Sequence, residues 1–109
     1  MNLSEKKSNN FNVISIEGRI DTTNYNDFER AVTAIIEKGD ANLVFNCAGL
    51  NYISSSGLRA FLSAQKKLIG LKGKLHLCEM QPHIKEIFDI SGFSNIFKIL
   101  GSEEEAVTE

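Results

Sequence analysis

The sequence predicts an α/β domain with a single mixed, largely parallel sheet of four to five strands and about four helices. Strand-like stretches of apolar residues alternate with stretches of helical spacing, and this order repeats along the chain. Such alternation indicates parallel strands joined by crossover helices. A chain of 109 residues, 42% apolar and 24% charged, suits a single domain over residues 1–109 with a core of its own.

The N-terminal part predicts at most one edge strand and then a strand proper. Residues 1–10 hold few apolar side chains and predict either a frayed end or a short edge strand. Residues 11–17 alternate β-branched and polar side chains, which predicts a strand that is partly buried on both faces. Gly18 is expected to end this strand.

Residues 24–38 predict the first helix, because their apolar side chains recur at helical spacing. Thr22 or Thr23 can cap its start, and Gly39 fits a left-handed stop after it. The short apolar run 41–45 follows. Such a run predicts a central strand that is covered on both faces.

Residues 46–53 predict a loop, and a second helix follows from Gly57 onward. Its apolar stripe comprises Leu58, Phe61, Leu62, Leu68 and Ile69. The side chains expected on its exposed side are Arg59, Gln65, Lys66 and Lys67. The stripe places this helix against the sheet.

The C-terminal third predicts two more strands and two more helices. Residues 74–78 alternate as a strand, and Pro82 suits the first turn of a third helix that ends at residues 91–92. Residues 97–100 predict a last short strand. Residues 102–105 have the form of a capping box, which predicts a short terminal helix.

Composition narrows the classes of function. The net charge of −2 leaves no basic surplus for direct nucleic-acid binding. No apolar run approaches the roughly 20 residues of a membrane span, and residues 1–10 are too polar for a signal peptide. We therefore expect a cytoplasmic protein without membrane insertion.

The residue types that carry catalysis or bind metals are not placed for either task. Cys47 and Cys78 lack Cys-x-x-Cys spacing and predict buried free thiols. His76 is expected to be a half-exposed strand residue and His83 a first-turn surface residue, and neither is placed as a base for Ser55. The first glycine of the hydrolase elbow is missing at this serine, and the glycines at 70 and 73 lack the spacing of a phosphate loop. No enzymatic activity, metal or cofactor is predicted.

Three consecutive hydroxyls lie where the central strand region leads into the second helix. Ser54, Ser55 and Ser56 precede Gly57 there. A helix N-terminus has unpaired N–H groups, so one serine is expected to serve as N-cap. An exposed serine at the same place could instead accept a phosphate, which carries about −1.5 to −2 charges. Spacing alone favours the capping interpretation.

The chain resembles the STAS domain of bacterial anti-sigma factor antagonists from about Phe11 to Val107. Four segments carry the resemblance in the same order and spacing. They are Ile16–Asp21, Leu43–Asn46, Tyr52–Arg59, and Ile87–Phe93 with Ile96–Phe97. The resemblance implies a regulator that binds an anti-sigma factor with serine-kinase activity, releases the sigma factor, and is switched off by phosphorylation. A serine phosphatase would reset it.

Carried over residue by residue, the resemblance implies that Ser55 is the phosphate acceptor and Ser56 its neighbour. Ser54 stands where many members have Asp. Asp21 and Asn46 match family positions close to the acceptor. The partner-binding residues implied are Asp21, Asn46, Ser54, Ser55, Ser56, Gly57 and Arg59.

Two other classes of function stay open at this point. One is an accessory or scaffold STAS domain of a stress-signalling or membrane-transport complex, which would need no acceptor serine. The other is an enzyme or nucleotide-binding protein, which would need the base or phosphate loop that the sequence lacks.

Overall fold

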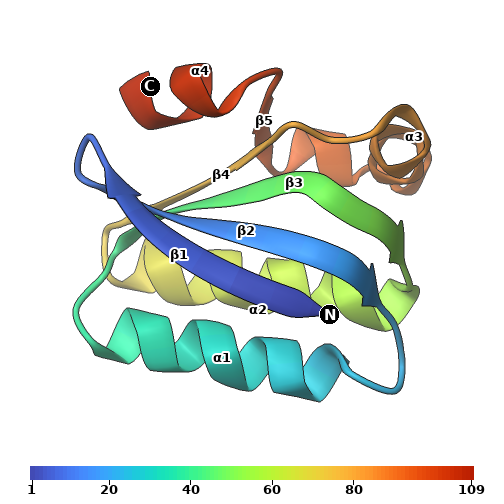
Figure 1. Ribbon diagram of the computed structural model, residues 1–109, viewed down its shortest axis with the longest axis horizontal. Coiled ribbons are helices and arrows are strands. Elements are labelled where there is room, and N and C mark those ends of the chain that lie inside the picture. Colours follow the sequence, from blue (N-terminus) through green and yellow to red (C-terminus); the bar gives the residue numbers. More distant parts are fainter.

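A computed structural model describes residues 1–109 and contains one five-stranded sheet with helices on both faces (Figure 1). The strands are β1 (Asn2–Ser8), β2 (Phe11–Ile20), β3 (Asn42–Ile53), β4 (Lys74–Cys78) and β5 (Lys98–Leu100). They lie in the order β1-β2-β3-β4-β5, with β1 antiparallel to β2 and the other neighbours parallel. The predicted mixed, largely parallel sheet is confirmed, and the polar N-terminal segment is its edge strand.

Four α-helices and one short 3-10 turn connect and follow these strands. They are α1 (Tyr25–Glu37), α2 (Ser55–Gly70), α3 (Pro82–Ser91), the 3-10 turn η1 (Phe93–Asn95) and α4 (Glu103–Thr108). Pro82 occupies the first turn of α3, and Gly92 ends that helix with φ of 83°. Both ends of α3 therefore follow the predicted start and stop signals.

Two predicted boundaries are wrong, because β2 and β3 pair along almost their whole length. Gly18 does not end β2. With φ of 96° it lies at a register shift, after which the pairing with β3 resumes. The predicted loop 46–53 is the second half of β3, which pairs with β2 as far as Ile20 and Ile53. The carboxyl ends of the two central strands therefore lie side by side.

The larger core lies between the sheet and the helices α1 and α2, which run next to each other along one face (Figure 1). It contains 22 buried residues. Phe61 of α2 is fully buried, with its ring 4.9 Å from that of Phe45 and 5.5 Å from that of Phe28. The apolar run in β3 is thus buried at the centre of the sheet, as predicted.

The opposite face of the sheet is covered in part by α4, over a second core cluster of six buried residues (Figure 1). Ser102 caps α4 in the predicted capping box. His76 is buried beneath this helix, with Nδ1 2.8 Å from the carbonyl oxygen of Ala106, so the prediction of a half-exposed residue is wrong. Cys47 and Cys78 are buried free thiols, as predicted, and belong to different core clusters.

Three details of the helices also differ from the predictions. The N-cap position of α1 is Asn24 rather than a threonine, and its side-chain oxygen accepts a hydrogen bond from the backbone N–H of Asp21. Gln65 is buried instead of exposed and donates to the carbonyl oxygen of Ile96 at 2.9 Å. Ile69, expected in the apolar stripe of α2, is 62% exposed. No helix has both the length and the apolar character that crossing a membrane requires.

Candidate functional site

The turn between β3 and α2 presents the three serines, and each hydroxyl has a different environment. We call residues 54–57 the serine turn. The backbone N–H of Ser54 donates to the carbonyl oxygen of Ile20 at 2.9 Å, which ties the turn to the end of β2. The Ser54 hydroxyl accepts from the backbone N–H of Gly57 at 3.2 Å and is the N-cap of α2. The predicted capping role is therefore confirmed, and it falls on Ser54.

Ser55 and Ser56 differ in what surrounds them. Ser55 is the first residue of α2, is exposed, and has no hydrogen-bond partner in the chain for its hydroxyl. Ser56 is only 5% exposed, and its hydroxyl accepts a hydrogen bond from Arg59 Nη2 at 3.3 Å. Ser55 is consequently the one serine of the turn whose side chain is both exposed and without a hydrogen-bond partner in the chain.

Gly57 brings the start of α2 close against the two central strands. A Cβ atom at this position would lie 2.7 Å from Ile53 Cγ1 and 2.9 Å from Ile20 Cγ2, well inside van der Waals contact. Only glycine therefore allows this approach. Because Gly57 directs the helix into the core, the preceding turn is held at the carboxyl edge of the sheet.

Asp21 follows β2 just as the serine turn follows β3, so the two segments are neighbours. Its carboxylate accepts hydrogen bonds from the Thr23 hydroxyl and backbone N–H and from Arg19 Nε, the last at 2.9 Å. These bonds, led by the one from the Thr23 hydroxyl, lower the pKa of Asp21 to about 2. A fixed negative charge therefore lies next to the serine turn at neutral pH.

Arg19 and Tyr52 complete this edge and were not among the predicted site residues. The Arg19 guanidinium lies 4.5 Å from the centre of the Tyr52 ring while it pairs with Asp21. The two residues pair across β2 and β3, one step before the strands end. Sequence reasoning missed them because it treated the segment before the serines as a loop, whereas pairing it as strand would have placed them together.

Asn46, in contrast, does not join the serine turn. Its side chain donates to Glu103 of α4 at 2.8 Å and accepts from the backbone N–H of Ala48 at 3.0 Å. Asn46 lies seven positions before Ile53 in an extended strand, which is roughly 20 Å at the usual rise per residue. The expectation that Asn46 lies close to the acceptor is therefore wrong, and Asn46 instead fixes the start of the terminal helix.

The histidines form hydrogen bonds away from the serine turn. His76 lies beneath α4, and His83 Nε2 is 2.8 Å from the carbonyl oxygen of Asn51. Neither is hydrogen-bonded to a serine of the turn, so the arrangement resembles no nucleophile–base pair.

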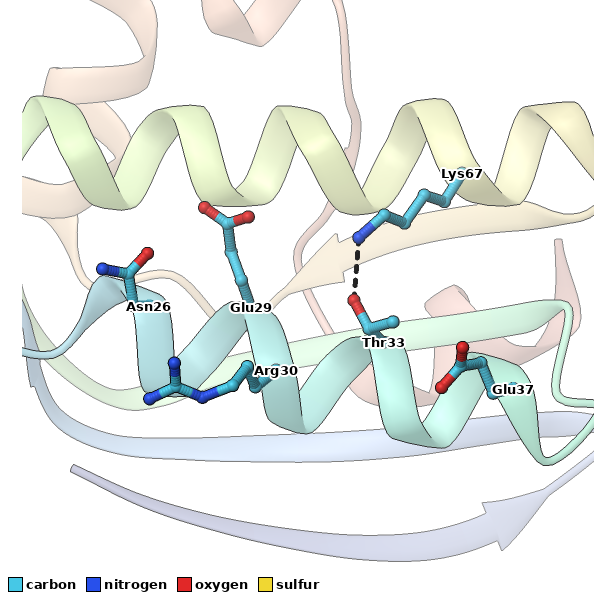
Figure 2. A pocket seen from close by; sticks show the side chains of 6 residues that line it. All are labelled: Asn26, Glu29, Arg30, Thr33, Glu37 and Lys67. Atoms are coloured by element: carbon cyan, nitrogen blue, oxygen red, sulfur yellow. Dashed lines mark hydrogen bonds between the residues drawn. The ribbon is translucent and has the colours of Figure 1, made fainter.

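None of the surface hollows is lined by a residue of the serine turn. One of about 450 Å³ separates α1 from α2, and Figure 2 shows Lys67 reaching across it to the Thr33 hydroxyl at 2.7 Å. Glu29 points toward α2 in the same view. This hollow has no apolar wall, which a small-molecule site normally has. A second, of about 360 Å³, is lined by Arg59, Leu62, Ser63, Lys66 and Lys67.

The fold and the serine turn define a STAS domain, and comparison with known proteins agrees. The STAS domain family matches residues 2–106, so the chain belongs to that family. It is 37% identical over 106 residues to BtrV of Bordetella bronchiseptica, a proposed anti-sigma factor antagonist, covering 97% of this chain and 91% of that protein.

Solved structures of similar proteins share the fold. An anti-sigma factor antagonist from Mycobacterium paratuberculosis superposes with a TM-score of 0.89 at 20% identity, covering 98% of this chain and 91% of that one. The Bacillus cell fate determinant SpoIIAA in its phosphorylated form gives a TM-score of 0.72 at 22% identity, covering 98% and 97%. At these identities the likeness establishes the fold alone.

Proposed function

We propose that the chain is an anti-sigma factor antagonist whose binding to an anti-sigma factor is switched off by phosphorylation of Ser55. The observation that carries the proposal is the exposed, unpartnered Ser55 hydroxyl at the first residue of α2. Membership of the STAS family and the similarity to BtrV support the choice of partner. Ser54 and Ser56 are less suited to modification, because one caps the helix and the other is buried.

The phosphate would come from ATP held by the anti-sigma factor, acting as a serine kinase. The Ser55 oxygen attacks the γ-phosphorus, ADP leaves, and the hydroxyl proton passes to a base of the kinase. A serine phosphatase hydrolyses the ester and restores the hydroxyl. In this scheme the chain is the substrate and the binding partner. It holds the Ser55 hydroxyl in position, and the kinase supplies the catalytic groups.

The partner would close over the surface formed by Asp21, residues 54–57 and Arg59. A neutral serine is small and lets another surface pack against it. A phosphate there carries about −1.5 to −2 charges that must be desolvated in the interface and that repel any carboxylate of the partner. Within the free domain, the N-terminus of α2 favours the same charge. Phosphorylation should therefore weaken binding while the fold persists.

The proposal is tested by the affinity of the anti-sigma partner for wild type, Ser55→Ala and Ser55→Asp. We expect Ser55→Ala to bind about as well as wild type and Ser55→Asp at least about tenfold more weakly, since a like-charge contact in an interface costs about 1.4 kcal/mol or more. Ser4→Asp on the exposed strand β1 adds the same charge away from the turn and should bind like wild type. Equal affinity for all four proteins would refute the switch.

A second measurement locates the modification. The protein is incubated with ATP and the candidate anti-sigma kinases of the same genome, and mass spectrometry maps the added phosphate. We expect phosphate on Ser55 and none on the Ser55→Ala variant. An accessory or scaffold role would instead give an unmodified protein that binds its partner with or without ATP.

A further inference from the structure

We infer that Arg59 is the internal counter-charge of a phosphate on Ser55, so that phosphorylation adds a negative charge to α2 and also neutralises this arginine. The inference rests on the proposed function only in taking Ser55 as the modified residue. It concerns which side chain of the domain the phosphate contacts once it is attached to Ser55.

The spacing of the two residues brings their side chains together. Ser55 and Arg59 are four residues apart on α2, and both are exposed. Residues at this spacing are neighbours on a helix surface, with Cβ atoms about 5–6 Å apart. The Arg59 guanidinium already extends back over the first turn, where Nη2 lies 3.3 Å from the Ser56 hydroxyl. It is thus placed beside the acceptor before any phosphate arrives.

Arg59 has no carboxylate partner that a phosphate would have to displace. Helix α2 contains no acidic residue, and the only hydrogen bond that the Arg59 guanidinium donates goes to a neutral hydroxyl, at a long distance. A guanidinium forms shorter and stronger hydrogen bonds to phosphate, often two in parallel. We therefore expect the guanidinium to leave Ser56 and pair with the phosphate.

The other ionisable residues around the turn are less suited to this role. Arg19, at the end of β2, is engaged by Asp21 and the Tyr52 ring. His83, on α3, lies against the carbonyl oxygen of Asn51. Asp21 is a fixed negative charge, which opposes a second one nearby and increases the need for a cation. Arg59 is the cation at this edge that remains available.

Pairing with Arg59 gives the modification two effects on a partner. In the unphosphorylated protein, the arginine is free to meet a carboxylate of the anti-sigma factor. After phosphorylation, it is held within the domain by the phosphate. A single modification then removes one favourable contact and introduces one unfavourable charge.

The test measures the second pKa of phosphoserine installed at position 55 during translation, so that no kinase is needed. Phosphorus NMR titrations compare wild type with Arg59→Gln, Arg19→Gln and Lys66→Gln. A nearby cation favours the dianion and lowers this pKa, so Arg59→Gln should raise it by roughly 0.2–0.4 units, the free energy of an exposed helix pair converted into pKa units. Lys66→Gln, also exposed but two turns further along α2, should leave it unchanged.

The same pKa in Arg59→Gln as in wild type would overturn the inference, and so would a larger rise in Arg19→Gln. Because Arg59 is exposed, all four proteins should give matching circular dichroism spectra. The result is independent of the kinase assay. Absence of phosphate on Ser55 in that assay would refute the proposed switch and leave the measured pairing intact.

Discussion

The two faces of helix α2 are opposite in character, although they belong to the same 16 residues. The inner face packs Gly57, Phe61 and Leu68 against the sheet, where each is buried. The outer face carries Ser55 and Arg59 in solvent. The helical repeat thus separates residues that hold the domain together from residues whose charge can change at little cost to folding. Substitutions on the inner face should lower the stability of the domain, whereas substitutions on the outer face should leave stability nearly unchanged.

Phe61→Ala should have the largest effect on stability, because it empties the centre of the inner face. The ring is fully buried and lies within 6.5 Å, centre to centre, of the rings of Phe28, Phe45, Phe88 and Phe97. Such truncations cost about 3–5 kcal/mol of unfolding free energy. Urea denaturation checks this value, and a loss below about 1 kcal/mol would contradict the assigned packing.

Gly57→Val should have the next largest effect, since it forces side-chain atoms into the contact between α2 and the ends of the two central strands. A Cβ atom there would lie 2.7 Å from Ile53 Cγ1, and overpacking of this kind costs about 1–3 kcal/mol. Gly70→Ala is the matched control, because a Cβ atom at that end of the helix meets nothing within 4 Å. Its unfolding free energy should equal or exceed that of wild type. Equal stability of both variants would contradict the close approach of α2 to the strand ends at Gly57.

Ser54→Ala removes the side chain that caps the N-terminus of α2. Losing the hydrogen bond to the Gly57 backbone N–H should cost about 1 kcal/mol. Ser55→Ala, one residue further along, makes a fair comparison, because its hydroxyl has no partner in the chain and its loss should change stability by less than about 0.5 kcal/mol. If the two thermal midpoints shift equally, the division of roles between these serines is wrong.

The smallest effect should appear as a pH dependence at the edge of the turn. The folded-state pKa of Asp21 is about 2, below its ordinary value of 3.8. A carboxyl with a lowered pKa stabilises the fold above its unfolded-state pKa, and this contribution is lost as pH falls from about 4 to 2. Asp21→Asn should therefore flatten the change of the urea midpoint across that window. An unchanged slope would show that the hydrogen bonds around Asp21 contribute nothing in solution.

Local signals in the sequence are sufficient for both ends of α3, for the start of α4 and for the cap of α2, although not for the N-cap of α1. A serine directly before a helix predicts an N-cap, and Ser54 is one. Ser102 and Glu105 form the capping box that their spacing predicts. The order of strands and helices follows from periodicity in the same way. These features depend on residues within one or two turns of each other, which a sequence displays directly.

Features that depend on distant partners could not be predicted. Gln65 is buried because it reaches the carbonyl oxygen of Ile96, 31 residues later. His76 is buried because α4, some 30 residues on, packs over it. Asn46 pairs with Glu103 across 57 residues rather than with the serine turn. In each case the polar side chain alone predicts exposure to solvent, and its hydrogen-bond partner becomes apparent only in the tertiary fold.

The central claim is that a charge on Ser55 controls a partner without disturbing the fold. Protein carrying phosphoserine at position 55 tests it most directly, with affinity for the anti-sigma factor and thermal midpoint measured on the same sample. We expect affinity to fall at least about tenfold while the midpoint stays within about 4 °C of the unphosphorylated protein. Unchanged affinity, or a fall in affinity that accompanies unfolding, would contradict the account.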